Sequence, residues 1–477
     1  MKIDDEIAHA AVEARDRRFD GLFFLGVTST GIYCRCVCPA RTPKRQNRRI
    51  YSTAAAAERD GFRPCLLCRP ERAPGQAPID AAERLAHDAL KRIEAGALEE
   101  SGLEGLAAEL GVTGRHLRRV MMETFGAAPI DLAQTHRLLT AKRLLADTDL
   151  SMARVAFASG FKSVRRFNAL FVERYRLTPS RVRRRPERPS AQALCLRLEA
   201  RGRLAPDTAV GDLRRRRIEG MEAQVDEGAW ARTLAIGPHQ GWLTLSVDPS
   251  GVELRLSDGL SPAVRQIVAA VRGAFDLDAD IDAIHGALSR HTSFAGEDLA
   301  VRLPGSIDPF ETAVRAVLGQ QVTLAAGRTL GARLVERFGA AVETPFPALT
   351  RLFPSPDRLA EAGPGDIARL GMPRKRGETV QALARAAAEG RLRLSRGALA
   401  AGRAGLAEIP GVGPWTLEYV ALRGLGDPDA FPLGDSALRS AFGDGDLGGA
   451  CEAWRPWRGY AAARLWQRHS NHERQAS

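Results

Sequence analysis

The chain has 477 residues, more than one hydrophobic core organises, so we expect three or four domains. Its net charge of +12, carried mainly by Arg, favours a polyanionic partner because phosphate contacts release counterions, although a generally Arg-rich composition would give the same balance. The acidic opening segment, MKIDDEIAHA, lacks the apolar core of a secretory signal, and no apolar run approaches the ~20 residues that span a bilayer. We therefore expect a cytoplasmic protein whose cysteines are reduced.

Four zones follow one another along the chain. Residues 1–76 hold most of the cysteines and end in a Pro/Gly stretch, and residues 80–185 carry the pattern of short amphipathic helices. Residues 191–281 mix strand-like runs with helices, and residues 282–470 are almost entirely helical in pattern. The predicted fold class is therefore multidomain and mainly α, with a small α+β domain at the N-terminus and a small α/β subdomain in the third zone.

The cysteines of the first zone have metal-ligand spacing. Cys34-x3-Cys38 is followed by Cys65-x2-Cys68, and paired thiolates on two turns are typical of a tetrahedral zinc site. Such a site can be purely structural. A dense set of cations beside it favours a surface that faces phosphate, and its members are Arg35, Arg41, Lys44, Arg45, Arg48, Arg49 and Arg63.

The segments Thr30–Arg35, Cys38–Arg41 and Gly61–Cys65 resemble the N-terminal domain of the Ada family. The resemblance implies that Cys34, Cys38, Cys65 and Cys68 bind zinc and that Cys34 accepts a methyl group from a DNA methylphosphotriester. Zinc keeps the sulfur as a nucleophilic thiolate, and methylation removes one negative charge, so affinity for DNA should rise. Cys36 departs from the family pattern and could compete for zinc or methyl.

The second zone contains two helix-turn-helix patterns. In Leu106–Leu117 an apolar helix reaches a glycine, then Thr113 as N-cap, then a helix that exposes Arg115 and Arg118. A second copy, Val155–Ser163, precedes Arg165 and Arg166. Together with Thr178–Ser180 the pair resembles the AraC family, which implies recognition helices in the major groove of promoter DNA, RNA polymerase as a partner and a place at the nucleoid. The alternative is a helical bundle with no role on DNA.

In the last zone a hairpin, Ile409–Thr416, precedes Ala430–Asp435, and its glycines would let the backbone approach a phosphate. Together they resemble the helix-hairpin-helix glycosylase superfamily. Further segments resemble its alkyladenine branch, the AlkA type: Leu303–Gly305, Asp308–Glu311, Val317–Val322, Gly371–Pro373 and Trp454–Arg458. The resemblance covers roughly 200 residues of this chain and implies that the third zone is the small TBP-like subdomain of the same branch.

An alkylated purine is cationic and a good leaving group, so the enzyme needs an electron-rich pocket more than a strong acid. Trp415, Tyr419 and Trp466 could stack on such a base, and Asp435 could stabilise the developing oxocarbenium ion or activate water. Asp435 could instead be only an N-cap. Superfamily members that also cut DNA carry a Lys where this hairpin has Trp415, so we expect a monofunctional enzyme that leaves an abasic site.

We therefore expect a zinc-containing, methylphosphotriester-sensing activator fused to a glycosylase that releases 3-methyladenine and related bases. The DNA-binding residues expected are Arg41, Arg45, Arg115, Arg118, Arg165, Arg166, Gly411 and Gly413. One alternative is a regulator whose glycosylase-like half is inactive, since the segment near 198–210 has lost the family's aromatic residues. Another is a glycosylase that its N-terminal modules only deliver to DNA. No Pro-Cys-His-Arg motif occurs, so methyl transfer from O6-alkylguanine is not expected.

Overall fold

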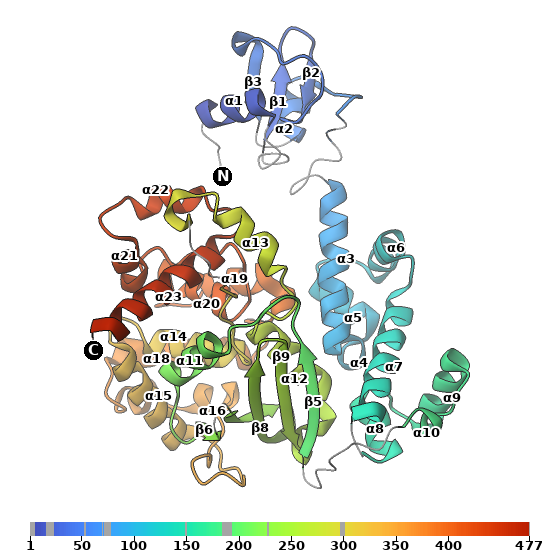
Figure 1. Cartoon of the computed structure of the whole chain (residues 1–477), viewed down its shortest axis with the longest axis vertical. Coiled ribbons are helices and arrows are strands. Elements are labelled where there is room, and N and C mark those ends of the chain that lie inside the picture. Colours follow the sequence, from blue (N-terminus) through green and yellow to red (C-terminus); the bar gives the residue numbers. More distant parts are fainter. Residues whose placement is uncertain are drawn as a thin grey trace. The chain divides into compact units, whose positions relative to one another are not determined.

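The structure is a computed structural model that describes residues 5–15, 23–51, 54–68, 70, 78–147, 150–183, 193–226, 229–295 and 301–476. The chain forms two compact units, one of residues 1–93 with 100–132 and one of residues 94–99 with 133–477 (Figure 1). Among the described residues, no helix combines the length and apolarity needed to cross a membrane. The predicted multidomain, mainly helical fold with two small sheets is confirmed.

The N-terminal domain is built on a four-stranded sheet of order β3-β1-β2-β4. The central strand β1 pairs antiparallel with β2 and β3, which places Leu25 opposite both Cys34 and Ile50. Alternate residues of β1 enter separate apolar clusters, Leu25 with Ala11 and Phe24 with Tyr33, so both faces of the sheet are covered. The elements are α1 (Asp5–Ala14), β1 (Phe24–Val27), β2 (Ile32–Cys34), η2 (Arg45–Asn47), β3 (Arg48–Tyr51), α2 (Ala54–Arg59) and β4 (Arg63–Pro64).

Two helix-turn-helix pairs follow, as the sequence predicts. The first is α5 (Gly102–Glu109) with α6 (Gly114–Phe125), and the second is α8 (Met152–Ala158) with α9 (Val164–Tyr175). The side chains of Thr113 and Ser163 accept backbone N–H groups and cap the second helix of each pair. The other helices of this region are α3 (Pro78–Ala95), α4 (Ala97–Glu100), α7 (Pro129–Asp147) and α10 (Pro179–Val182).

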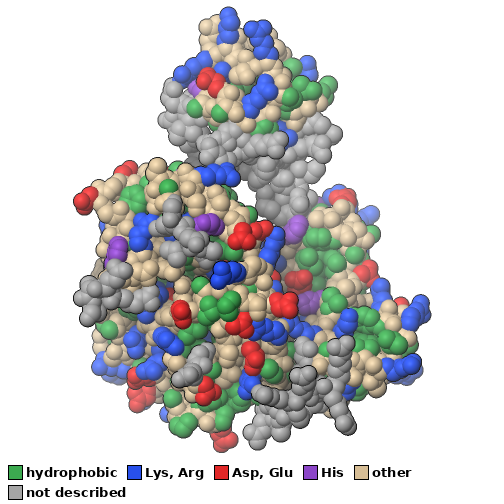
Figure 2. Space-filling view, in the orientation of Figure 1, with side chains coloured by type: hydrophobic (Ala, Val, Ile, Leu, Met, Phe, Trp, Pro, Cys, Tyr) green, Lys and Arg blue, Asp and Glu red, His purple; other side chains and the backbone are tan. Residues whose placement is uncertain are grey.

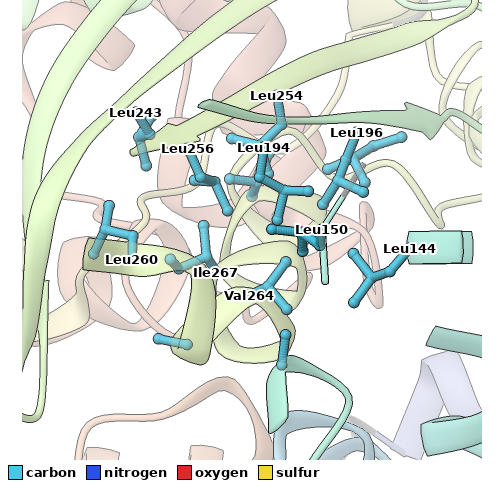
Figure 3. Close-up of a cluster of buried hydrophobic side chains, with 14 of the residues drawn as sticks. Leu144, Leu150, Leu194, Leu196, Leu243, Leu254, Leu256, Leu260, Val264 and Ile267 are labelled. Carbon is cyan, nitrogen blue, oxygen red and sulfur yellow. The ribbon is translucent and has the colours of Figure 1, made fainter. Parts of the chain in front are cut away.

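The third zone forms an antiparallel five-stranded sheet of order β5-β9-β8-β7-β6. Its strands are β5 (Ala193–Glu199), β6 (Glu222–Asp226), β7 (Ala229–Ile236), β8 (His239–Asp248) and β9 (Gly251–Ser257), and its helices are α11 (Pro206–Arg216), η4 (Asp258–Ala263) and α12 (Val264–Ala274). Leu144 and Leu150 of the helix-turn-helix region lie in one core with Leu194, Leu196 and Val264 (Figure 3). The second helix-turn-helix pair and this sheet therefore share a single hydrophobic core.

The C-terminal zone is an array of short helices around two further cores. Its elements are α13 (Ile281–Leu288), η5 (Thr292–Phe294), α14 (Pro309–Leu318), α15 (Leu324–Phe338), α16 (Pro356–Glu361), α17 (Pro364–Ala368), α18 (Arg374–Ala388), η6 (Arg396–Ala398), α19 (Leu399–Ala407), α20 (Pro414–Arg423), α21 (Ser436–Phe442), α22 (Leu447–Glu452) and α23 (Arg458–Ala476). The hairpin lies between α19 and α20, and Asp435 lies at the start of α21.

Candidate metal centre and active-site cleft

The four predicted zinc ligands meet at one end of the N-terminal sheet. Cys34 ends β2, Cys38 follows on a turn, and Cys65 and Cys68 follow β4. The Sγ atoms of all four lie within 4.8 Å of one another. Four sulfur atoms around one zinc ion are about 3.8 Å apart when each Zn–S bond is about 2.3 Å, so the cluster needs little adjustment to hold the metal. These four residues form the zinc site of the protein.

The electrostatics of the cluster call for a cation. A hydrogen bond to Cys68, burial and the neighbouring thiolates raise the pKa of Cys34, and burial raises the pKa of Cys38 to about 11. The hydrogen bond from Cys34 lowers the pKa of Cys68 to about 6, and the backbone N–H of Arg35 also donates to its sulfur, at 3.4 Å. Without a metal the four groups cannot ionise together because their charges repel, and a divalent cation removes that penalty.

Cys36 does not join the metal cluster. It is 2% exposed and packs in the apolar cluster of Ala11, Val12 and Leu25, apart from the cluster that holds Cys34. Strand alternation would place Cys34 and Cys36 on the same face, but β2 ends at Cys34, so the alternation does not extend to Cys36. Because its side chain lies in this apolar cluster, Cys36 is poorly placed to compete with the four ligands for zinc.

The cations near the cysteines divide into two groups. Arg41 and Arg45 are exposed, and Figure 2 shows Lys and Arg side chains spread over the visible surface of this domain. Arg48 belongs to the same cation-rich region but does not contribute to an exposed surface, because its side chain is 5% exposed and bonds to Glu13 at 3.1 Å. Arg35 donates to the carbonyl oxygen of Cys68 at 3.1 Å and so supports the metal loop.

The second helix of each helix-turn-helix pair exposes its predicted basic residues. Arg115 and Arg118 lie on the solvent side of α6, and Arg165 and Arg166 lie on the solvent side of α9. The opposite faces are apolar and buried, with Leu117, Val120 and Met121 on α6 and with Phe167 and Phe171 on α9. Each helix therefore offers a cationic face without losing its packing.

A cleft of about 1820 Å³ in the second unit contains the predicted catalytic and base-binding residues. Asp435, Trp415, Tyr419 and Trp466 all line it, as do the hairpin glycines. The ring of Trp415 stacks on that of Tyr419 with centroids 5.0 Å apart, and Trp466 meets Tyr419 edge-on at 6.1 Å. This volume exceeds the roughly 300–1,000 Å³ of a typical small-molecule pocket, so the cleft has room for more than a single base.

Asp435 is both a helix cap and a member of the aromatic site. Its Oδ1 accepts the backbone N–H groups of Ala437 at 3.0 Å and Leu438 at 3.2 Å, which is the N-cap geometry expected from the sequence. Its Oδ2 accepts the indole N–H of Trp415, and Oδ1 accepts that of Trp466, each at 3.1 Å. Capping and a role in the cleft are therefore compatible, and both indoles hold the carboxylate in place.

The hairpin before α20 is fixed by its glycines and by Gln320. Gly411 has a φ of +88°, and a Cβ atom there would collide with the side chain of Thr379. The amide of Gln320 donates to the carbonyl oxygen of Gly411 at 3.0 Å and to the hydroxyl of Thr416 at 2.9 Å. Gly413 has open space around it, as a backbone that must approach another molecule requires.

Three charged residues of the cleft were missed by sequence reasoning. Arg216 donates to the hydroxyl of Tyr419 at 2.7 Å, and its guanidinium carbon lies 5.8 Å from the ring centroid. Arg423 lies 5.8 Å from the same centroid and 5.9 Å from that of Trp466. Asp212 forms ion pairs with both arginines. Its i, i+4 spacing from Arg216 and its i, i+3 spacing from Arg215 on α11 were local signals, but such pairs are common on helix surfaces.

Models of four protein families match the chain in order. They are the metal binding domain of Ada over residues 8–71, a helix-turn-helix domain over residues 106–185, the AlkA N-terminal domain over residues 195–308 and the HhH-GPD superfamily of base excision DNA repair proteins over residues 314–445. The chain is thus a zinc-binding, DNA-binding regulator joined to a helix-hairpin-helix DNA glycosylase. The residue boundaries that the sequence predicts for the domains stay predictions.

Three curated relatives illustrate the match. The "Probable bifunctional transcriptional activator/DNA repair enzyme AlkA" of Mycobacterium tuberculosis is 38% identical over 98% of this chain and 97% of that protein. DNA-3-methyladenine glycosylase 2 of Escherichia coli is 35% identical over 54% of this chain and 91% of that protein. The bifunctional transcriptional activator/DNA repair enzyme Ada of Escherichia coli is 34% identical over 30% of this chain and 39% of that protein. The chain belongs to the AlkA family of bifunctional transcriptional activators and DNA repair enzymes.

Proposed function

We propose that the second unit is a monofunctional DNA-3-methyladenine glycosylase in which Asp435 is the catalytic carboxylate. The observation that carries this proposal is that the indole N–H groups of Trp415 and Trp466 both donate hydrogen bonds to the carboxylate of Asp435 in the aromatic cleft. A nucleotide rotated out of the duplex would place its base against Trp415, Tyr419 and Trp466 and its sugar near Asp435. Gly411 and Gly413 would hold the DNA backbone beside the hairpin.

The proposed reaction is a hydrolysis. The bond between C1′ and the base nitrogen breaks, its electron pair leaves with the alkylated base, and the oxygen of water bonds to C1′ as water gives up a proton. Asp435 stabilises the positive charge on the sugar or accepts that proton. Among the described residues no Lys lines the cleft, so no amine is placed to form a Schiff base with the sugar. An abasic site with an intact strand is the expected product.

For the N-terminal domain we propose transfer of a methyl group from a DNA phosphotriester to Cys34. The thiolate attacks the methyl carbon, the carbon–oxygen bond breaks, and the phosphate keeps the electron pair as a phosphodiester anion. The zinc site then holds one negative charge less, which favours binding to promoter DNA through Arg41 and Arg45 and through Arg115, Arg118, Arg165 and Arg166 of the recognition helices. RNA polymerase is the proposed partner of the bound form.

Base release from methylated duplex DNA tests the glycosylase. We expect wild type to release 3-methyladenine without cutting the strand, and Asp435→Asn to be slower by at least about 100-fold. The matched control is Asp446→Asn, because Asp446 caps α22 through the N–H of Gly449 at 3.1 Å and lies outside the cleft. Equal losses in both variants would assign Asp435 to capping alone. No release by folded, zinc-loaded wild type would favour a regulator whose glycosylase-like half is inactive.

Peptide mass spectrometry tests the methyl transfer. After incubation with DNA that contains methylphosphotriesters, the peptide with Cys34 should gain the mass of one CH2 group, and the other three ligands should not. The comparison between Cys34 and Cys38 matters because Cys38 is the more exposed of these two ligands, whereas Cys34 is 8% exposed. Methylation of Cys38 instead would show that access to the sulfur, and not its place in the family motif, selects the acceptor.

A further inference from the structure

The aromatic rings of the cleft already contact cations of the protein itself. Arg216 and Arg423 each place the guanidinium carbon 5.8 Å from the centroid of Tyr419, and Arg423 also lies 5.9 Å from that of Trp466. Arg423 is almost completely buried, with its side chain 6% exposed. Such contacts draw on the same negative ring faces that would attract a cationic base. Two positive charges beside the site would also repel such a base.

Asp212 offsets these two charges. Its Oδ1 lies 3.2 Å from Nε of Arg216, and its Oδ2 pairs with Nη2 of Arg423. Within the described part of the chain, no other carboxylate lies within ion-pair distance of either arginine. Burial raises the pKa of Asp212, but Arg423 and Arg216 outweigh burial and hold that pKa well below its usual range. The carboxylate is therefore charged throughout the physiological pH range.

The other buried charges of the cleft are already balanced among themselves. Glu311 lies 2.6 Å from Arg232 and 2.8 Å from Arg315, and Glu222 lies 3.6 Å and 3.4 Å from the same two arginines. Asp435 accepts hydrogen bonds from Trp415 and Trp466 and forms no ion pair with Arg216 or Arg423 among the described contacts. The balance of charge beside Tyr419 therefore depends on Asp212, which also lies 3.5 Å from the more exposed Arg215, and loss of that carboxylate adds one net positive charge.

We propose that Asp212 is a specificity-determining residue, which neutralises the arginines behind Tyr419 so that the cleft accepts a positively charged alkylated base. The role of Asp212 rests on the glycosylase activity proposed above. With Asp212 neutral, a cationic base such as 7-methylguanine meets an added positive charge, whereas a neutral base such as hypoxanthine does not. Close to the site, one added unit charge at a protein-like dielectric is expected to change the selectivity at least about tenfold.

The test is single-turnover release of 7-methylguanine and of hypoxanthine from duplexes of the same sequence. We expect Asp212→Asn to reduce the rate for 7-methylguanine at least about tenfold more than the rate for hypoxanthine, which is about 1.4 kcal/mol in selectivity. The control is Asp248→Asn, since Asp248 forms an ion pair with Arg197 at 2.5 Å in the same subdomain but outside the cleft. It should not change the ratio of the two rates.

A second variant separates charge from packing. If Asp212 acts by neutralising Arg216, the double variant Asp212→Asn/Arg216→Gln should regain release of 7-methylguanine, although it removes one more native side chain. Equal loss of both bases in Asp212→Asn, or no recovery in the double variant, would overturn the proposed role. If wild type releases only 7-methylguanine, the test of the proposed role is whether the double variant regains release of 7-methylguanine that Asp212→Asn has lost. A wild type that releases neither base would instead refute the glycosylase itself.

Discussion

Removal of Arg232 should destabilise the second unit more than removal of any exposed arginine of the same sheet. The Arg232 side chain on β7 is 7% exposed and lies 2.6 Å from Glu311 of α14 and 3.6 Å from Glu222 of β6, each of which is 5% exposed. Arg232→Met would leave two buried carboxylates with Arg315 as their remaining cation. Loss of one partner from a buried ion pair costs about 3–5 kcal/mol because the other charge stays desolvated.

Calorimetry of the full-length protein measures this cost. In a unit of about 350 residues the entropy of unfolding is large, so a loss of about 3 kcal/mol lowers the midpoint of unfolding by roughly 4 °C. The control is Arg255→Met, because Arg255 pairs with Glu253 on β9 with side chains 56% and 41% exposed, and such a pair contributes at most about 1 kcal/mol. The double variant Arg232→Met/Glu311→Gln should regain part of the loss, since it removes a buried charge with its partner. Equal shifts for Arg232→Met and Arg255→Met would refute the reasoning.

Three further predictions concern pH, metal and DNA. Burial and the nearby Glu311 raise the pKa of Asp308 to about 6, above the value in the unfolded chain, so the contribution of Asp308 to stability falls as the pH rises through this range. Asp308→Asn should therefore raise the midpoint of unfolding relative to wild type near pH 8 but not near pH 4. Thermal scans at both pH values measure this difference. Metal analysis should find one zinc per chain in wild type and in Cys36→Ala but almost none in Cys65→Ala, and zinc loss from Cys36→Ala would contradict its place in the apolar core. Arg165→Gln should weaken binding to promoter DNA and lower the slope of log affinity against log salt by about 1 if this arginine contacts phosphate; an unchanged affinity would remove α9 from the interface.

Local patterns were sufficient to predict much of this protein. The spacing of Cys34, Cys38, Cys65 and Cys68 predicted the metal centre because ligands on two short turns converge whatever the rest of the chain does. Caps such as Thr113 and the glycines of the turns located the second helix of each helix-turn-helix pair. Asp435 was found from its distance along the chain to the hairpin, and the structure places its carboxylate between Trp415 and Trp466.

Only the tertiary structure decided the charge of the cleft. Asp212 and Arg423 are 211 residues apart, and they become partners because folding brings these residues of α11 and α20 to the same cleft. Likewise, the side chain of Arg48 is buried and pairs with Glu13 although it lies in a cation-rich segment, and Cys36 lies in an apolar core although it is two residues from a metal ligand. The sequence by itself determined which chemical groups each domain carries, since metal spacing, caps and hairpins depend on neighbours along the chain. Which charges neutralise one another depends on distance in space, and folding alone sets that distance.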